Sequence, residues 1–356
     1  MGINFQADCR PVLIGSLPLK DHDEAVRWVF EYTPEIPLWV QLPIYKEEGM
    51  IKQFLPGMPG LTTIDDKVFI DTGAEGFERD LLGFYEEYVA VGEGRQALSD
   101  SRFVLTPDSA PGFSAFTGHL ERTGAQALAL KGQVTGPITF CTGVHDQNGR
   151  AIFYDAQLRD AAVKLLALKA RWQVQQLLRF KRPVFIFFDE PALAGFGSSE
   201  FISITPEEIQ NCFEEVFAAV HSEGGLAGVH ICANTDWSLV LGSEVDIVNF
   251  DAYAYFDRFI LYPDQIKKFI ESGRILAWGL VPTLNTEDIE RETTDRLLAA
   301  WEERLEKIQA LGLEREKILR QSLITPSCGA GSLSLDLAQK VLRLTSELSA
   351  CLNKSL

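Results

Sequence analysis

The residues in this sequence that are best suited to chemistry are one imidazole and two thiols, those of His230, Cys232 and Cys328. His230 and Cys232 follow an apolar run, and alternation along an extended chain puts both on the same side of the backbone. Two thiolates and an imidazole suit Zn²⁺, with a fourth position left for water, substrate or a carboxylate. A substrate thiol entering that position is deprotonated and stays nucleophilic at neutral pH. Taken singly, each residue reads as a buried core thiol or a structural histidine, so the metal prediction depends on all three lying together.

Apolar segments alternate with helical patterns along most of the chain, and they are expected to position these residues. Strands are predicted at residues 11–16, 37–41, 127–132, 184–188, 226–229, 246–250, 275–279 and 318–324. Helices are predicted at residues 21–32, 151–180, 205–224, 263–272 and 286–311. Continuous apolar strands separated by helices indicate a parallel sheet covered on its outer face. We therefore predict an α/β fold, a (β/α)8 TIM barrel that forms one domain over residues 1–356, with a doubly wound open sheet as the alternative.

The regular alternation is interrupted after the second predicted strand, over residues 44–125. This stretch contains a turn-rich segment at residues 56–60, a possible hairpin around residues 65–67, and helices near residues 76–91 and 112–123. Segments of this length without the core rhythm are usually lids or subdomains. We interpret residues 44–125 as an insertion, or lid, over one face of the barrel.

The carboxyl ends of the strands form the working face of such a barrel. Ser16 follows the first predicted strand, Asp189 and Glu190 follow the fourth, and Asp251 follows the sixth. The two metal-capable side chains after the fifth strand and Cys328 after the eighth are expected at the same end. The working face therefore combines the predicted metal ligands with several carboxylates.

Charge and cysteine usage limit the partners and the compartment. The 356 residues carry a formal net charge of -17, which argues against nucleic acid and against an anionic membrane surface. No apolar run approaches the roughly 20 residues that a membrane span needs, and the N-terminus lacks the layout of a signal peptide. The six cysteines are scattered rather than framed as a disulfide scaffold. A cytoplasmic protein with free thiols is expected.

Several short motifs resemble the catalytic barrel of cobalamin-independent methionine synthase and, more broadly, the zinc methyltransferases of the uroporphyrinogen decarboxylase superfamily. The motifs stand in the same order along the chain: IGSLP at residues 14–18, KGQVTGP at residues 131–137, DEPAL at residues 189–193, His-x-Cys at residues 230–232 and Cys-Gly at residues 328–329. The likeness spans nearly the whole chain as a single barrel, without the N-terminal barrel of the full-length synthase. It implies a zinc-dependent transferase in methionine biosynthesis.

The resemblance also implies roles for individual residues. Zinc would be held by His230, Cys232 and Cys328, with Asp251 where the family has a glutamate as fourth ligand. Ser16 would bind a substrate carboxylate, and Asp189, with Glu190 beside it, would bind a substrate ammonium and serve the chemistry. The segment after the seventh strand lacks the histidine that the synthase uses as an acid, and His145 is the candidate replacement.

The sequence does not identify the acceptor thiol or the methyl donor. The acceptor is expected to be a small thiol, homocysteine or similar, bound as a zinc thiolate. The methyl donor is expected to be methyltetrahydrofolate or a methyl-corrinoid, the latter on a corrinoid protein, because a departing cobalt needs no acid. Two alternatives are a uroporphyrinogen-type decarboxylase, which requires several arginines to bind carboxylates, and a non-catalytic corrinoid- or metal-binding protein.

Overall fold

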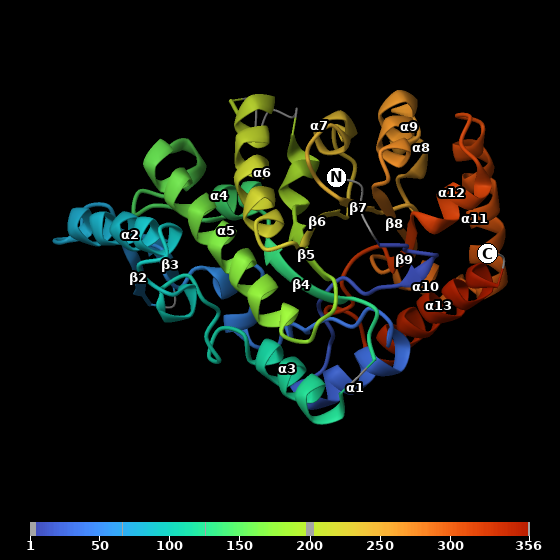
Figure 1. Ribbon diagram of the computed structural model, residues 1–356, viewed down its shortest axis with the longest axis horizontal. Helices are drawn as coiled ribbons and strands as arrows, with labels where there is room; N and C mark the ends of the chain where they lie inside the picture. The colour runs from blue at the N-terminus through green and yellow to red at the C-terminus, as the bar shows by residue number, and fades with distance from the viewer. Residues whose placement is uncertain (1–4, 66, 125, 197–202, 355–356) are drawn as a thin grey trace.

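The computed structural model describes residues 5–65, 67–124, 126–196 and 203–354, and its centre is a curled parallel sheet of seven strands (Figure 1). The strands lie in the order β1–β9–β8–β7–β6–β5–β4, and each neighbouring pair is parallel. Their bounds are β1 (Arg10–Pro11), β4 (Leu130–Thr135), β5 (Val184–Asp189), β6 (Leu226–Ile231), β7 (Ile247–Phe250), β8 (Ile275–Val281) and β9 (Ser322–Pro326). The predicted α/β architecture with a parallel sheet is confirmed. The order contains no reversal, which a doubly wound sheet requires.

The second predicted strand does not form a full ladder. Residues 38–41 contact the two edges of the sheet through isolated parallel bridges, from Leu38 to Lys131 of β4 and from Gln41 to Ser16. The first strand is likewise regular only over Arg10–Pro11. Among the described residues the sheet therefore has seven named strands, and closure into a complete eight-stranded barrel remains a prediction.

Helices cover the outer face of the sheet, as parallel strands with apolar residues on both faces require (Figure 1). The helices that follow the strands are α1 (His22–Tyr32), α4 (Pro137–Gly143), α5 (Ala156–Leu178), α6 (Pro206–His221), α7 (Trp237–Leu241), α8 (Phe256–Phe259), α9 (Pro263–Glu271), α10 (Thr286–Arg291), α11 (Thr294–Gln309), α12 (Arg315–Arg320) and α13 (Leu335–Asn353). At α6 the Thr205 side chain and Glu208 form a reciprocal capping box.

Several predicted boundaries are wrong, and three of them have a clear local reason. The helix predicted at residues 286–311 is divided into α10 and α11, because the Thr293 side chain accepts a hydrogen bond from the Arg296 amide and starts a new helix. The strand predicted at residues 318–324 begins only at Ser322, since residues 315–320 form α12. The helix predicted from residue 151 begins at Ala156, where Asp155 caps it, after a 3-10 turn, η4 (Ile152–Tyr154).

Residues 44–125 contain elements outside the strand–helix alternation. They are η1 (Lys46–Glu48), η2 (Lys52–Phe54), the hairpin β2 (Leu61–Ile64) and β3 (Lys67–Ile70), α2 (Phe77–Gly92), η3 (Leu98–Asp100) and α3 (Pro111–Thr123). The hairpin is antiparallel as predicted, although residue 66 in its turn lies outside the described residues. The hairpin and α2 project to one side, whereas α3 lies beside α1 (Figure 1). A role for this stretch as a lid remains a prediction.

The inner face of the curled sheet is layered. A small apolar cluster, which includes Val12, Phe185 and Phe187, fills its amino-terminal part. Polar side chains follow toward the carboxyl ends, and the first is Lys131, which is fully buried. Its ammonium donates a hydrogen bond to the Ile14 carbonyl and lies 4.6 Å from the centre of the Phe187 ring. Burial lowers the Lys131 pKa to about 8, partly offset by the charge of Asp189.

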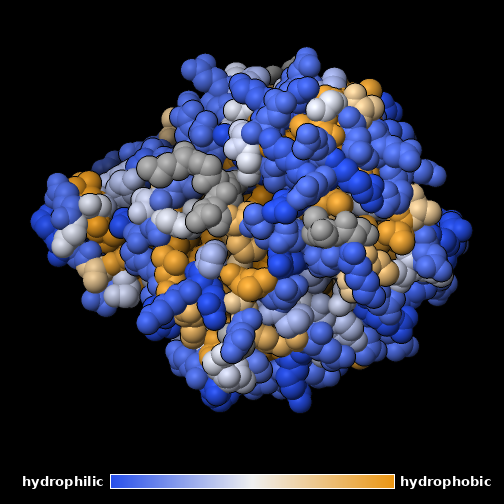
Figure 2. Space-filling model, turned by 45° about the vertical axis from the view of Figure 1, so that its right-hand side comes forward, coloured by the Kyte–Doolittle hydropathy of each residue, from blue (hydrophilic) through white to orange (hydrophobic). Residues whose placement is uncertain are grey.

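On the face drawn in Figure 2 most side chains are hydrophilic, and the hydrophobic ones gather near its middle. Among the helices described, none combines the length and the apolar character that spanning a membrane requires.

Replacing Phe187 by alanine tests the packing of this interior. Phe187 is fully buried, it supports Lys131, and its ring fills the space beside Gly228. We expect Phe187→Ala to lower the free energy of unfolding by about 3–5 kcal/mol, because it leaves a cavity that rigid strands cannot close. Urea denaturation followed by circular dichroism measures the change. The control is Leu261→Ala at a 65 % exposed side chain, where a change beyond about 0.5 kcal/mol is not expected; equal losses in both variants would contradict this account.

Candidate functional site

A cavity of about 370 Å³ opens at the carboxyl ends of the strands. Its wall is formed by the ends of β5, β6 and β9, the chain after β1, and the segment that leads into η1. The polar side chains that face it are Ser16, Gln41, Glu48, Asp189, His230, Cys232, Cys328 and Ser332. Within the described part of the chain, its wall contains no arginine. The cavity is therefore the place where most of the predicted site residues meet.

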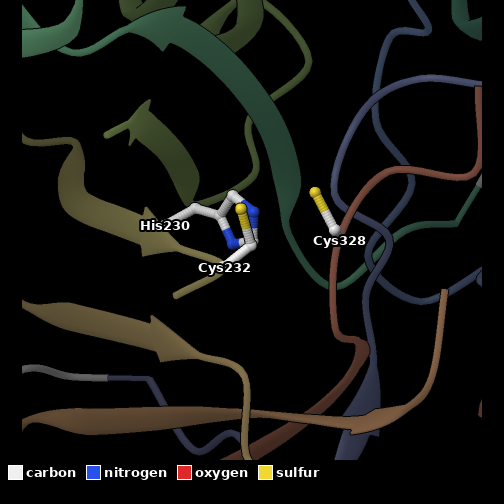
Figure 3. Close-up of side chains that lie close together, drawn as sticks. All are labelled: His230, Cys232 and Cys328. Atoms are coloured by element: carbon white, nitrogen blue, oxygen red, sulfur yellow. The ribbon is translucent and has the colours of Figure 1, made fainter. Parts of the chain in front are cut away.

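His230, Cys232 and Cys328 lie together in this cavity (Figure 3). Their ligand atoms are all within 4.8 Å of one another. His230 is in β6, Cys232 follows directly, and Cys328 approaches on the chain that leaves β9. Strand alternation brings the first two to one side, as predicted, and the curl of the sheet brings the third.

Asn249 of β7 fixes the orientation of the imidazole. Its Nδ2 donates to the Ala277 carbonyl at 2.8 Å and to Thr325 Oγ1 at 2.8 Å. A carbonyl can only accept, so Asn249 Oδ1 must face His230 Nδ1, with which it is hydrogen bonded. Nδ1 therefore carries the hydrogen of the neutral ring, and Nε2 keeps a free lone pair.

The residues fit a metal ion on three grounds. The Nε2 atom of His230 is buried and has no hydrogen-bond partner among the described residues, which is costly unless a ligand satisfies it. The donor set of one imidazole and two sulfurs is the one that Zn²⁺ prefers. An outer partner that holds the other ring nitrogen, here Asn249, is also typical of metal-binding histidines.

Hydrogen bonding between the two thiols moves their pKa values in opposite directions. A hydrogen bond from Cys328 and the nearby imidazole of His230 lower the pKa of Cys232, although burial opposes this. The same pairing, with burial, raises the pKa of Cys328. Cys232 is therefore the thiolate of the pair.

Asp251 lies after β7 near these residues but is not among the clustered ligand atoms. Its Oδ1 accepts a hydrogen bond from the Ala254 amide at 2.8 Å. Burial raises its pKa to about 6. A role for Asp251 as the fourth ligand remains a prediction.

Asp189, at the end of β5, and Ser16, after β1, both face the cavity. Within the described part of the chain, the Oδ1 atom of Asp189 is buried without a hydrogen-bond partner. Burial raises the Asp189 pKa, opposed by the charges of His230 and Lys131. Ser16 Oγ accepts a hydrogen bond from the Gly331 amide at 3.2 Å. An orphaned carboxylate oxygen is suited to a donor group on a bound molecule, such as an ammonium.

The structure does not bring Glu190 or His145 to the cavity. The Glu190 carboxylate turns toward the start of α4, where it accepts hydrogen bonds from the Ile138 and Thr139 amides at 2.9 and 2.8 Å. Burial raises its pKa to about 7. His145 is exposed, in a bridge with Ala151. Neither lines the wall, and their predicted roles gain no geometric support.

Sequence reasoning missed three polar groups in the wall, Gln41, Glu48 and Ser332. Gln41 Nε2 donates to Gln53 Oε1 at 2.6 Å, and Gln53 in turn donates to the Ser109 carbonyl at 2.8 Å. This chain fixes the Gln41 amide in one orientation. For Gln41 the sequence contained one indication of a site residue, because it is polar and ends an apolar run. For Glu48 it contained none, because this residue lies in an irregular segment.

Comparison with known proteins finds no match by sequence and several solved structures of similar fold. No protein-family model and no curated protein sequence match this chain. Among solved structures it is similar to a B12-independent methionine synthase from Shewanella sp. W3-18-1 in complex with selenomethionine, with a TM-score of 0.47 and 17 % identity over 68 % of this chain and 67 % of that chain. It is also similar to an endo-beta-1,4-mannanase double mutant from Cellulomonas fimi, with a TM-score of 0.39 and 14 % identity over 73 % and 61 % of the two chains. The chemistry of the site therefore rests on its own residues.

The thiol pair predicts selective alkylation. In chelator-treated protein at about pH 6, iodoacetamide should modify Cys232 much faster than Cys9 or Cys141, because only the thiolate reacts and the Cys232 pKa is lowered while the other two are raised. Peptide mapping by mass spectrometry measures the rates.

A variant at Cys328 tests whether its hydrogen bond causes the reactivity of Cys232. Cys328→Ala removes the hydrogen-bond donor, so the Cys232 pKa should rise and its alkylation at about pH 6 should slow. Equal rates at Cys232 in both proteins would show that the pair does not share a proton.

Proposed function

We propose that this protein is a zinc-dependent S-methyltransferase that transfers a methyl group to a small thiol. The observation that carries the proposal is the cluster of His230, Cys232 and Cys328, whose ligand atoms lie within 4.8 Å of one another in the wall of a cavity. A structural zinc site is usually closed by four protein ligands, whereas three leave a position open for substrate. The cluster therefore favours a catalytic metal.

The acceptor is a small thiol that carries a donor group, of which homocysteine is an example. The cavity volume of about 370 Å³ suits a molecule of that size. The unpartnered Oδ1 of Asp189 would accept a hydrogen bond from a substrate ammonium, and the Ser16 hydroxyl would donate one to a substrate carboxylate. These two side chains would orient the sulfur toward the three ligands.

His230, Cys232 and Cys328 would hold the Zn²⁺. When bound there, the ion would lower the pKa of the acceptor thiol and keep it nucleophilic as a thiolate at neutral pH. Asn249 keeps His230 Nε2 directed into the cavity. Apolar wall residues such as Ile14, Pro43 and Pro191 exclude water from the attacking sulfur.

The methyl donor would approach from the mouth of the cavity, because the volume beyond the acceptor is small. Ile44, Tyr45 and Met50 are exposed large side chains in the segment that borders the mouth. They would contact a flat donor, either methyltetrahydrofolate or the methyl-corrinoid of a partner protein. Decarboxylation of the uroporphyrinogen type has less support, since the described cavity wall contains no arginine.

Metal analysis tests the proposed ligand set. We expect one zinc per chain in the purified protein and its loss in Cys232→Ala and Cys328→Ala, because each removes a thiolate ligand. Elemental analysis after dialysis measures the content. Cys351→Ala, in α13, is the matched control and should retain its zinc. A wild-type protein without zinc, or a Cys328→Ala protein that keeps it, would contradict the proposal.

A transfer assay tests the reaction. Methylcobalamin and methyltetrahydrofolate are offered with homocysteine, coenzyme M and glutathione, and the methylated thiols are measured by mass spectrometry. Transfer to at least one thiol is expected, and Asp189→Asn should raise the KM for an amino-group-bearing thiol far more than for coenzyme M. Binding of thiols without turnover would instead indicate a non-catalytic binding protein.

A further inference from the structure

Glu48 is the second carboxylate in the cavity wall, and neither the proposed metal site nor the proposed thiol orientation uses it. Its Oε2 accepts a hydrogen bond from the Leu42 amide at 3.0 Å. Its Oε1 lies 2.8 Å from Nε2 of His22, the first residue of α1. The Glu48 side chain is 1 % exposed, whereas that of His22 is 18 % exposed. The pair therefore extends from the cavity wall to the solvent.

Packing holds the two side chains in this arrangement. The His22 ring stacks on Tyr45 with 5.8 Å between ring centres and 18° between planes, and the Tyr45 hydroxyl donates to the Lys20 carbonyl at 2.7 Å. On the other side α3 approaches at Gly112, where a Cβ would lie 1.9 Å from the Val40 carbonyl oxygen and 3.4 Å from the His22 ring. Only glycine permits this approach, so the ring is confined.

The ionisable groups around the ring are few. The ring contacts Glu48, in η1, and Tyr45, the residue before η1. The other charged residues of η1 are Lys46 and Glu47, and Glu47 pairs with Lys52. α3 approaches the ring at a glycine. On α1 and its cap, Asp21 accepts from the Glu24 amide and Asp23 pairs with Arg122. Glu48 is thus the charged partner that the ring contacts.

A thiol that reacts as a thiolate must lose a proton inside this cavity. Asp189 cannot pass that proton on through the contacts described, because its Oδ1 has no hydrogen-bond partner and it lies deep beside His230 and Lys131. Glu48 borders the same cavity and is hydrogen bonded to a ring that reaches water. Of the two carboxylates in the wall, Glu48 alone has a connection to the outside among the described contacts.

We propose that Glu48 and His22 form a proton relay that carries the thiol proton from the cavity to the solvent. The S–H bond breaks with its electron pair left on sulfur, and the proton passes to the Glu48–His22 pair, where it is held on the imidazole beside the carboxylate. The imidazolium then releases one proton to water, and the pair returns to its starting state. The relay deepens the proposed thiol methyltransferase function and rests on it.

Proton release on thiol binding tests the relay. Zinc-loaded protein is mixed with homocysteine in weakly buffered solution that contains a pH indicator, and the release is followed by stopped flow. Glu48→Gln keeps hydrogen-bonding groups but cannot carry the proton, and His22→Ala removes the exit; we expect both to slow release about 10²-fold. The affinity for homocysteine and the zinc content should be unchanged, and added imidazole should restore release in His22→Ala.

A second readout is independent of methyl transfer. In cadmium-substituted protein the ultraviolet band of the sulfur–cadmium bond reports thiol ligation, and its appearance should slow by the same factor in both variants. If Glu48→Gln does not fold, Glu48→Asp replaces it and should also show slower release, because the shorter side chain lies farther from His22.

The matched control is His221→Gln. His221 also lies 2.7 Å from a carboxylate, that of Asp246, but this pair precedes β7 at the opposite end of the sheet. Wild-type rates are expected there. Wild-type release in Glu48→Gln and His22→Ala, or no rescue by imidazole, would overturn the relay while leaving the methyltransferase proposal intact. A wild-type protein that binds no thiol would overturn both.

Discussion

The hydrogen bonds of one amide, that of Asn249, determine which atom of His230 faces the cavity. The Nδ2 atom of Asn249 donates a hydrogen bond to the Ala277 carbonyl. The Oδ1 atom of the same amide is therefore the one that faces the imidazole of His230. The ring therefore presents Nε2, unpartnered, where Cys232 and Cys328 converge. If the amide were flipped, it would donate to Nδ1 and clash electrostatically with a carbonyl. The orientation of the imidazole is thus decided on β7, two strands away from β9, the strand that leads to Cys328.

The layered interior makes this arrangement possible. Apolar side chains fill the amino-terminal part of the curled sheet, buried polar side chains such as Lys131, Asn249 and Thr325 lie farther toward the carboxyl ends, and the clustered His230, Cys232 and Cys328 stand at those ends. Each layer follows from the two-residue repeat of parallel strands in register. The polar layer is costly to bury, but its hydrogen bonds hold the side chains above in fixed orientations.

The sequence was sufficient for the parts of the molecule that depend on periodicity. Apolar runs located β5, β6, β7 and β8, and strand alternation with a common working face brought His230, Cys232 and Cys328 into one prediction. It placed the start of β9 four residues too early, because the apolar residues at the end of α12 suit a buried helix as well as a strand.

Residue roles at the site were harder to predict, because they depend on side-chain direction. Glu190 follows Asp189 directly, yet alternation sends it outward to the amides of α4. Glu48 lies in an irregular segment with no period, and only the fold places it in the cavity wall. Orientation within a strand was readable from the sequence, and orientation within a loop was not.

The separation of the ligands along the chain has a consequence for biosynthesis. Residues 230 and 232 leave the ribosome long before residue 328 of the 356-residue chain. The complete set of donor atoms exists only after β9 has been made and has docked beside β8 and β1. If the cluster holds the proposed zinc, the ion would bind only after translation of nearly the whole chain. A truncated product that ends before β9 would contain the imidazole and one sulfur but not the assembled cluster.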